Sequence, residues 1–371
     1  MKMHENSMID FVRETGYANY PDLSNVKKVL VIHLRHIGDV ILSEPVARVL
    51  HEQLKPEQID FLVNEGTEVL LESHPHITNL HVIKRSRFTH GLKERISEEI
   101  RIFRLLKNGG YDLVIGLNPG SRVERCERFS GAPLRIGIAS KKAGKGYTHK
   151  VSMAPGGRHY VDRHLDVLRR IGLFDSQPKR VPQIDLYKST SLRMKDSLVQ
   201  AGVAESGKYL VIHPTSRWMF KCLAPNEVAL IINNLCQVIN LPIVLSAGPD
   251  ALEMSYIERV KSFLTCEVID FSGSLSLTGL AELIRGAQLL ITVDTASLHI
   301  AEAVQTPVVV FFGPTDEVDW GPRSKKSLVV RANNYTCSPC NRDGCGGGKV
   351  SSCLLGFDEK KLVKQIHDFI K

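Results

Sequence analysis

The sequence contains no run of the roughly 18–20 uninterrupted apolar residues that a membrane span requires. Its first residues, MKMHENSMIDFVRETGY, include no apolar segment of the kind found in secretory signals, so we expect a cytoplasmic protein. Cysteine is sparse, at 8 of 371 residues, which excludes a disulfide scaffold, and cytoplasmic thiols are normally reduced. With 43% hydrophobic and 24% charged residues, the chain is not disordered, and its length favours two domains.

Common nucleotide and nucleic-acid signatures are also missing. There is no G-x-G-x-x-G dinucleotide fingerprint and no G-x-x-x-x-G-K-[ST] P-loop. Zinc-finger, RNP-type and helix-turn-helix patterns are absent as well, so nucleic acid is not an expected partner.

Positive charge is concentrated in the first half of the chain. Residues 1–183 hold 29 basic and 21 acidic residues, whereas residues 184–371 hold 19 of each. Within the first half, the segment 84–150 holds 16 basic and 6 acidic residues. This asymmetry indicates an anionic partner, although a solvated basic face would give the same pattern.

Short apolar runs alternate with helical patterns along the whole chain. In the first half we expect strands at 29–34, 59–63, 80–83, 112–117 and 134–138. We expect one helix that follows the first strand and ends near residue 54, and two more over 92–108 and 160–171. In the second half we expect strands at 209–213, 243–246, 268–270, 289–293 and 308–312, with helices at 189–201, 225–239, 252–264, 277–286 and 297–304.

This alternation predicts an α/β protein with two doubly wound parallel sheets. We place the domains at 26–182 and 183–371, after an extension over 1–25 to which we assign no role; the C-terminal helix could pack back on the first domain. Parallel sheets bind ligands at the carboxyl ends of their strands, so a cleft between the domains is the expected site.

The first candidate site is Leu34-Arg35-His36-Ile37-Gly38-Asp39, directly after the first expected strand. Gly38 permits a tight turn, and Asp39 falls at a helix start that faces the cleft. A carboxylate there can serve as a general base. Asp is also a favoured helix N-cap, and on the local pattern alone the capping interpretation is the stronger one.

The second candidate is the turn Asp294-Thr295-Ala296-Ser297, between a strand and a helix. The free N–H groups at such a helix start form an anion site, and small residues let a phosphate approach the backbone. Ordinary capping by Asp294 or Thr295 is the alternative. His299 lies one turn further, and a lone histidine is by default structural.

Two more turns follow strands of the second half. In His213-Pro214-Thr215-Ser216-Arg217-Trp218-Met219-Phe220-Lys221, two hydroxyls followed by two cations can surround a diphosphate, although a solvated basic loop is an equal alternative. Ser246-Ala247-Gly248-Pro249-Asp250 is the other turn. Three such turns in one domain point to a nucleotide-type ligand there.

Four cysteines lie close together near the end of the chain: Cys337, Cys340, Cys345 and Cys353. Only one tight pair is present, whereas structural zinc normally uses two, so free thiols are favoured over a zinc site. A labile disulfide would need an oxidising setting. The remaining four cysteines, Cys126, Cys222, Cys236 and Cys266, are dispersed and are expected to be small core or surface residues.

Five blocks occur along the chain in the order VLVIHLRHIGDVILSEPVARVL, HPTSRWMFKCL, SAGPD, VDTASLHIAEAVQTPVVVFFGPTD and CSPC. Together they resemble glycosyltransferase family 9, the ADP-heptose:lipopolysaccharide heptosyltransferases. The block HPTSRWMFKC looks closest to the heptosyltransferase III type. The resemblance implies a GT-B fold, with the acceptor on the first domain and the donor nucleotide on the second. It also implies inverting transfer of heptose from ADP-L-glycero-D-manno-heptose to the lipopolysaccharide inner core, without a metal or other cofactor.

The resemblance also implies roles for single residues. Asp39 matches the family's catalytic base, which strengthens the base interpretation. The donor contacts are Thr215, Ser216, Lys221, Gly248, Pro249, Leu275 against the adenine, Asp294, Thr295, Ala296 (often Gly in relatives) and His299. The acceptor contacts are Arg35, His36 and Arg122.

The basic stretch would hold the anionic core acceptor and bring the enzyme to the inner face of the inner membrane. No D-x-D triplet, by which many glycosyltransferases hold a metal, occurs in a turn expected at the cleft. One rival is a family member with another nucleotide-sugar or acceptor glycan. The other is a non-catalytic protein that binds nucleotide-sugar or nucleic acid.

Overall fold

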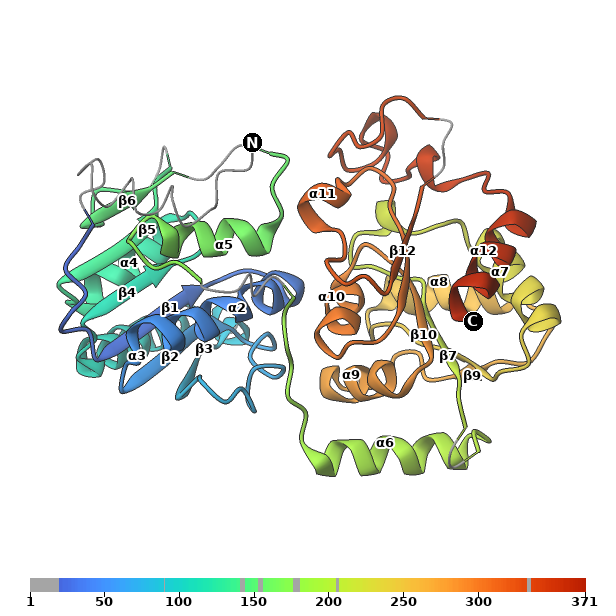
Figure 1. Ribbon diagram of the computed structural model, residues 1–371, viewed down its shortest axis with the longest axis horizontal. Coiled ribbons are helices and arrows are strands. Elements are labelled where there is room, and N and C mark those ends of the chain that lie inside the picture. The colour runs from blue at the N-terminus through green and yellow to red at the C-terminus, as the bar shows by residue number, and fades with distance from the viewer. Residues whose placement is uncertain are drawn as a thin grey trace, which may run out of the picture.

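The chain forms two lobes, each built around one parallel sheet (Figure 1). This computed structural model describes residues 20–89, 91–140, 144–152, 156–175, 181–204, 207–331 and 335–371. The expected α/β class and the two doubly wound sheets are therefore confirmed. The expected extension lies almost wholly outside the described residues.

The first sheet has the strand order β3-β2-β1-β4-β5-β6, and each neighbouring pair is parallel. Its strands are β1 (Lys28–His33), β2 (Gln58–Asn64), β3 (Asn79–Ile83), β4 (Leu113–Gly116), β5 (Leu134–Ile138) and β6 (His149–Val151). Its helices are α2 (Ile37–Leu54), α3 (Leu92–Gly109), α4 (Ser121–Ser130) and α5 (Tyr160–Arg169), with a 3₁₀ turn η1 (Arg85–Phe88) before α3.

The second sheet has the order β12-β11-β10-β7-β8-β9, again with parallel pairs throughout. Its strands are β7 (Leu210–His213), β8 (Ile243–Leu245), β9 (Ile269–Asp270), β10 (Leu289–Val293), β11 (Val308–Phe311) and β12 (Ser327–Val330). Its α-helices are α6 (Lys188–Gln200), α7 (Pro225–Val238), α8 (Ala251–Lys261), α9 (Leu277–Gly286), α10 (Ala296–Ala303), α11 (Glu317–Trp320) and α12 (Glu359–Ile370). Its 3₁₀ turns are η2 (Met219–Lys221), η3 (Cys345–Gly347) and η4 (Ser352–Leu354).

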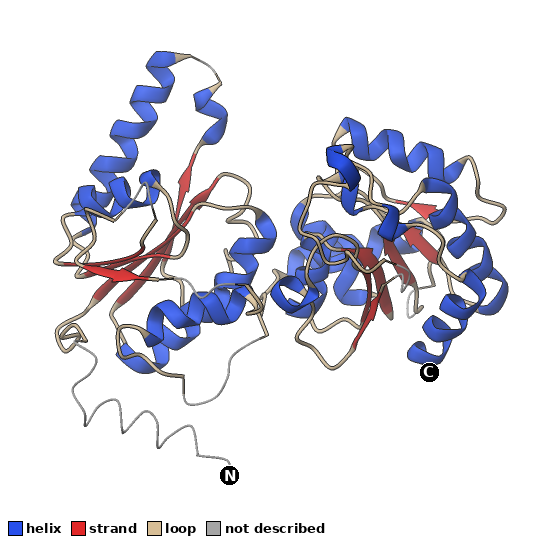
Figure 2. Cartoon of the chain, turned by 90° about the horizontal axis from the view of Figure 1, so that it is seen from above, coloured by secondary structure: helices blue, strands red, loops and turns tan. Residues whose placement is uncertain are grey.

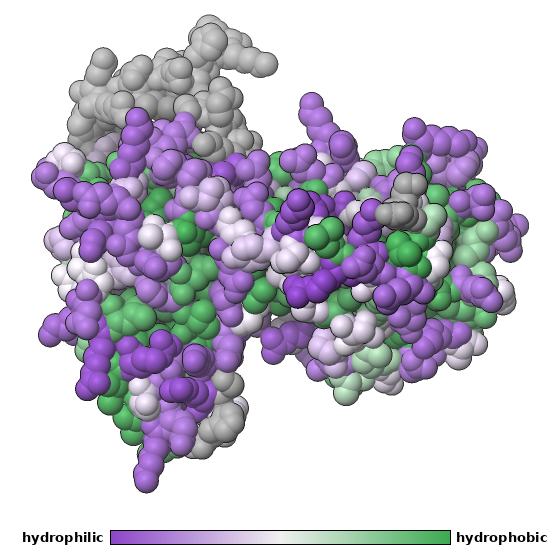
Figure 3. All heavy atoms as spheres, turned by 90° about the horizontal axis from the view of Figure 1, so that it is seen from below, coloured by the Kyte–Doolittle hydropathy of each residue, from purple (hydrophilic) through white to green (hydrophobic). Residues whose placement is uncertain are grey.

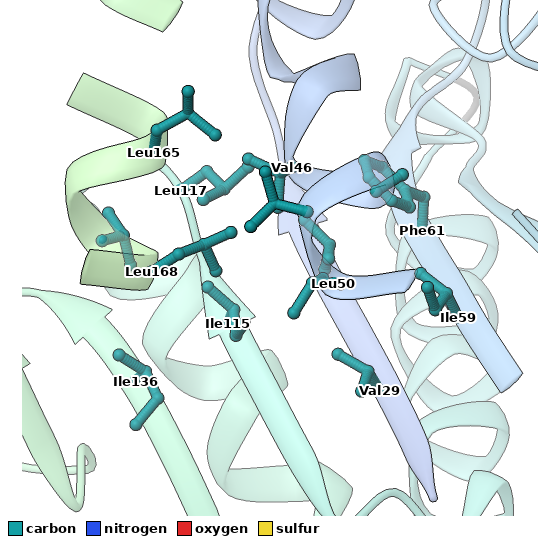
Figure 4. Close-up of a cluster of buried hydrophobic side chains, with 14 of the residues drawn as sticks. Val29, Val46, Leu50, Ile59, Phe61, Ile115, Leu117, Ile136, Leu165 and Leu168 are labelled. Carbon is teal, nitrogen blue, oxygen red and sulfur yellow. The ribbon is translucent and has the colours of Figure 1, made fainter. Parts of the chain in front are cut away.

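Helices cover both faces of each sheet, so the central strands are buried on both sides (Figure 2). This explains why their sequences are continuous apolar runs rather than alternating ones. In the first lobe, Leu50 of α2 and Leu168 of α5 point onto Val29, Ile115 and the neighbouring strand residues (Figure 4). The rigid sheet holds the loops at its carboxyl edge, and these loops carry the candidate site.

Four elements and two placements differ from expectation. The short edge strands β6 and β12, the charged helix α4 and the short helix α11 were not predicted. Helix α12 packs on α7 within the second lobe, so the expectation that it returns to the first domain is wrong. Cys236 and Cys266 are paired as a disulfide, with Cα atoms 6.7 Å apart, and not independent small residues as expected.

The two lobes touch through named contacts. The ring of Tyr160 stacks on Trp320 with centroids 3.7 Å apart. Asp319 accepts hydrogen bonds from Arg163 at 2.8 Å and from the backbone N–H of Gly157 at 3.1 Å. Ile41 of α2 belongs to a buried apolar cluster that is otherwise formed mostly by the second lobe. Within the described part of the chain, no helix has the length and apolarity needed to cross a bilayer.

Candidate active site

Asp39 lies in the first turn of α2, just beyond the carboxyl end of β1. The helix begins at Ile37 with His36 as the N-cap residue, and Asp39 is the third helical residue. Its Oδ2 accepts a hydrogen bond from the backbone N–H of His36 at 3.3 Å. The expected N-cap role is therefore corrected: Asp39 supports the helix start from inside, as in a capping box, and its side chain stays partly exposed.

Gly38 brings this turn against the second lobe. A Cβ atom added to Gly38 would lie 2.9 Å from Cδ2 of His299 and 3.8 Å from Cα of Ala296. Both residues belong to the first turn or two of α10, so a side chain at residue 38 would push the lobes apart. The candidate base and the candidate anion turn are thus neighbours across the cleft.

Cations surround the start of α2. Burial lowers the pKa of His36, and the charges of Arg217, Arg35 and Arg85 lower it further against the opposing effect of Asp39. Nη1 of Arg217, from the second lobe, lies 3.5 Å from Nδ1 of His36. Of the two expected acceptor contacts, His36 thus meets the second lobe, and Arg35 precedes it in the chain. Two arginines that the sequence did not single out for this group, Arg85 and Arg217, add to the positive charge around His36.

Arg122 is engaged elsewhere. It donates a hydrogen bond to Glu99 of α3 at 2.8 Å, and its guanidinium lies 4.6 Å from the centre of the Phe88 ring. These contacts connect α4, α3 and η1 within the first lobe. The structure thus does not place Arg122 in the cation group around His36.

The turn between β10 and α10 carries a buried ion pair. Nζ of Lys221 donates to Oδ2 of Asp294 at 2.6 Å. Thr295 is the N-cap of α10, and among the described residues its side chain forms no capping hydrogen bond. The first turn of the helix is therefore open to an anion, beside an ammonium group. Ser297 differs, because its buried hydroxyl bonds to Thr292 at 2.7 Å.

Glu253 connects the other two donor turns. Its Oε2 accepts a hydrogen bond from the Thr215 hydroxyl at 2.6 Å and another from the Gly248 N–H at 3.0 Å. The Thr215 side chain is fully buried, so its hydroxyl is committed to Glu253 and not to a diphosphate as expected. Sequence reasoning missed Glu253; the D-x-x-E pattern from Asp250 indicates a helix start but not this partner.

Leu275 and His299 complete the predicted donor set. Leu275 is half-buried just before α9. The backbone N–H of Gly273 donates a hydrogen bond to the carbonyl of Ala247, so this segment lies next to the turn that contains Gly248. His299 is almost fully buried, and its Nδ1 has no hydrogen-bond partner among the described residues. Oε2 of Glu302 lies 4.0 Å from that nitrogen.

The four clustered cysteines lie in and just before the 3₁₀ turns η3 and η4. Cys337 and Cys345 are exposed and Cys353 is buried, and all four are unpaired thiols. Over the described residues, no group of three or more His, Cys, Asp or Glu side chains is arranged to hold a metal ion. A hydrogen bond from the Ser352 N–H lowers the pKa of the Cys345 thiol. The zinc interpretation therefore gains no support from this arrangement.

The family of the chain is shown by comparison with known proteins. The model of glycosyltransferase family 9 (heptosyltransferase) matches residues 100–350. Lipopolysaccharide heptosyltransferase 3 of Escherichia coli strain K12 is 31% identical over 319 residues, covering 84% of this chain and 89% of that protein. The chain belongs to glycosyltransferase family 9. It is therefore a glycosyltransferase of the heptosyltransferase family.

Solved structures share the fold of this family-9 transferase. The family 9 glycosyl transferase of Veillonella parvula DSM 2008 superimposes with a TM-score of 0.81 at 20% identity, covering 95% of this chain and 99% of that one. E. coli ADP-heptose lipopolysaccharide heptosyltransferase II gives 0.76 at 17% identity, covering 92% and 98%. These similarities confirm the expected GT-B architecture.

Proposed function

We propose that this enzyme transfers heptose from ADP-L-glycero-D-manno-heptose to the lipopolysaccharide inner core, with inversion at the anomeric carbon and without a metal ion. The relatives support the substrate class, because one is a lipopolysaccharide heptosyltransferase and another is an ADP-heptose lipopolysaccharide heptosyltransferase. The remaining support comes from the site.

The observation that carries the proposal is the approach of Gly38 to His299 and Ala296. It brings the first turn of α2, which carries Asp39, against the first turns of α10 on the second lobe. An acceptor hydroxyl held on the first lobe would then face a sugar whose diphosphate rests on the second. Base and leaving group on opposite sides of the sugar are what inversion requires.

In the proposed reaction, the acceptor hydroxyl attacks the anomeric carbon while Asp39 takes its proton. The bond between that carbon and the ADP oxygen breaks, and the sugar passes through a state with oxocarbenium character. Negative charge then accumulates on ADP. Lys221 and the N–H groups of the first turn of α10 would stabilise that charge, because both are fixed in place before the reaction.

The cations around His36 fit an anionic acceptor. The charges of Arg35, Arg85 and Arg217 act on His36 at the start of the helix that carries Asp39, and Arg217 contacts His36 from the second lobe. Inner-core sugars carry carboxylates and phosphates, which arginine binds in a bidentate manner. Binding to both lobes, through Arg35 and Arg217, would also draw the cleft closed over the donor.

The test is incubation of the purified protein with ADP-heptose and a defined inner-core acceptor. Mass spectrometry is expected to show one added heptose, and NMR of the product the inverted anomer. ADP-glucose and UDP-sugars serve as competing donors. Transfer from one of these but not from ADP-heptose would reassign the donor, whereas nucleotide-sugar binding without transfer would contradict the enzyme role of this site.

A further inference from the structure

Helix α3 has an exposed apolar stripe on the side that faces away from the core. Leu92, Ile96 and Ile100 follow one another at every fourth residue and are 71%, 50% and 43% exposed. Ile102 and Leu106 of the same helix are buried in the first lobe. A surface helix normally presents polar residues to solvent, so a second apolar side needs an explanation.

The stripe continues onto the neighbouring helix. Phe103 of α3 stacks on Phe129 of α4 with ring centroids 3.9 Å apart, and Phe129 is itself 49% exposed. At 3.6 residues per turn, the side chains of residues 92, 96, 100 and 103 fall within an arc of about 80°. We call the set Leu92, Ile96, Ile100, Phe103 and Phe129 the α3 stripe.

Cations border the α3 stripe. Lys93, Arg104 and Lys107 are exposed, and their helical positions lie within or next to the same arc. Arg125 is exposed one turn before Phe129 on α4. The acidic Glu94 falls on the far side of the helix, and Glu99, which lies next to the arc, is neutralised by its ion pair with Arg122. Apolar side chains flanked by Lys and Arg fit an anionic bilayer surface, where the first enter the acyl boundary and the second bind headgroups.

The position of the stripe fits this occupant as well. The start of α3 and η1 project from the body of the first lobe (Figure 2). On that projection, hydrophobic surface is bordered by hydrophilic residues at the lower left of Figure 3. The turn η1 follows the carboxyl end of β3, and Asp39 follows the carboxyl end of β1, so the projection begins at the same edge of the parallel sheet as Asp39.

We propose that the α3 stripe docks the first lobe on an anionic lipid surface, with the cleft mouth beside the headgroups. This docking role rests on the proposed function in one respect: the acceptor of the proposed reaction is anchored in a membrane. Docking itself is measured without any transfer, so the two can fail separately.

The direct test is co-sedimentation with vesicles of phosphatidylethanolamine and phosphatidylglycerol, with phosphatidylcholine vesicles as the neutral comparison. We expect the protein to sediment with the anionic vesicles in a salt-dependent manner. The double variant Ile96→Ser/Ile100→Ser is expected to lower the partition coefficient about tenfold or more, because two inserted side chains are lost. The triple variant Lys93→Gln/Arg104→Gln/Lys107→Gln should weaken binding to anionic vesicles and reduce its salt dependence.

The matched control is Leu230→Ser/Val238→Ser on α7, whose side chains are 43% and 50% exposed, the same values as Ile100 and Ile96. It is expected to bind vesicles like the wild type. Equal loss in both double variants, or binding that ignores lipid charge, would overturn the proposal. A change of oligomeric state in the α3 variant, measured by light scattering, would assign the stripe to a second copy of the chain instead.

Transfer assays give the second readout. With acceptor embedded in anionic vesicles, Ile96→Ser/Ile100→Ser should lower kcat/KM about tenfold, while rates with a lipid-free core oligosaccharide stay at the wild-type value. Equal loss on both acceptors would mean that the stripe supports the fold or the cleft and not lipid docking. If neither protein transfers heptose but the vesicle result holds, the proposed function fails and the docking stands.

Discussion

Nζ of Lys221 and Oδ2 of Asp294 lie 2.6 Å apart, and this ion pair joins the turn η2 to the end of β10. Only 18% of the Lys221 side chain and 5% of the Asp294 side chain are exposed. The carboxylate therefore fixes the ammonium group at the open first turn of α10. It also means that the diphosphate of a donor would meet a cation already held in place.

Lys221→Ala is expected to weaken ADP binding about 10- to 100-fold, which corresponds to the loss of one hydrogen bond to a charged group. Turnover should fall with it, because charge on the diphosphate grows in the transition state. Isothermal titration calorimetry with ADP measures the first effect. An unchanged ADP affinity would remove Lys221 from the donor site.

The pair offers its own control. In Lys221→Ala, the buried Asp294 carboxylate loses its cation and would repel the diphosphate. Replacing it as well, in Lys221→Ala/Asp294→Asn, should restore part of the lost ADP affinity. Strictly additive losses in the two single variants would show that the ion pair does not shape the anion site.

Gly38→Ala is expected to lower kcat/KM with only a small change in the free energy of unfolding, because the gain in helix propensity offsets part of the clash. Alanine favours a helix over glycine by about 1 kcal/mol, so the α2 helix itself should gain. The added methyl group, however, would meet the buried ring of His299 at 2.9 Å and force the two lobes or the ring to move. Steady-state kinetics and urea unfolding separate these effects.

The matched control is Gly156→Ala, because an added Cβ at Gly156 has no described atom within 4 Å. It should leave kcat/KM unchanged. If Gly38→Ala also leaves kcat/KM unchanged, the close approach of the two lobes is not needed for catalysis.

Transfer is expected to persist in excess EDTA, because Lys221 and the first turn of α10 supply the positive charge that a metal would otherwise bring. The rate is measured within the mixing time and again after addition of Mg²⁺. Immediate loss of activity that Mg²⁺ restores would contradict the metal-free mechanism.

Acidification should destabilise the fold from neutral pH downward. Burial, helped by the charge of Arg323, lowers the pKa of His159 from 6.5 to about 3, and burial lowers that of His213 to about 4. Below about pH 6.5 the unfolded chain therefore binds more protons than the folded one. For each such histidine, the free energy of unfolding falls by about 1.4 kcal/mol per pH unit, until the folded pKa is reached.

Urea unfolding at pH 7.5 and pH 5.5 checks this expectation, and His213→Asn provides the comparison. The variant removes one titrating group, so its stability should depend less on pH over that interval. The expectation fails if the wild type is as stable at the lower pH, or if His213→Asn leaves the pH dependence unchanged.

Most of the fold was predictable because buried parallel strands have a strong signature. Runs such as VLVIH and LLITV are apolar throughout and are followed by turns and helices. The missed elements lack that signature. β6 is a three-residue edge strand containing Lys150, and α4 contains only Val123, Cys126 and Phe129 as large apolar side chains. Short, charged elements depend on their neighbours in space, which periodicity does not reveal.

The donor turns were located from strand–turn–helix spacing, but the hydrogen-bond partners of their side chains were not predicted. Glu253 joins Thr215 to Gly248 over 38 and 5 residues of sequence, and Arg217 meets His36 over 181. The pairing of Cys236 with Cys266 is of the same kind. Such contacts follow from how two lobes and several loops fold together, so a local pattern identifies the turn but not the partner of each side chain.

The central claim, that Asp39 is the base beside the donor turn, is tested most directly by Asp39→Asn. The amide oxygen can still accept the hydrogen bond from His36, so the start of α2 is preserved while the base is lost. The account predicts that turnover of ADP-heptose falls about 10²–10⁴-fold while calorimetry finds ADP bound as tightly as before. Turnover close to that of the wild type would contradict it, and Asp39 would then only support the helix.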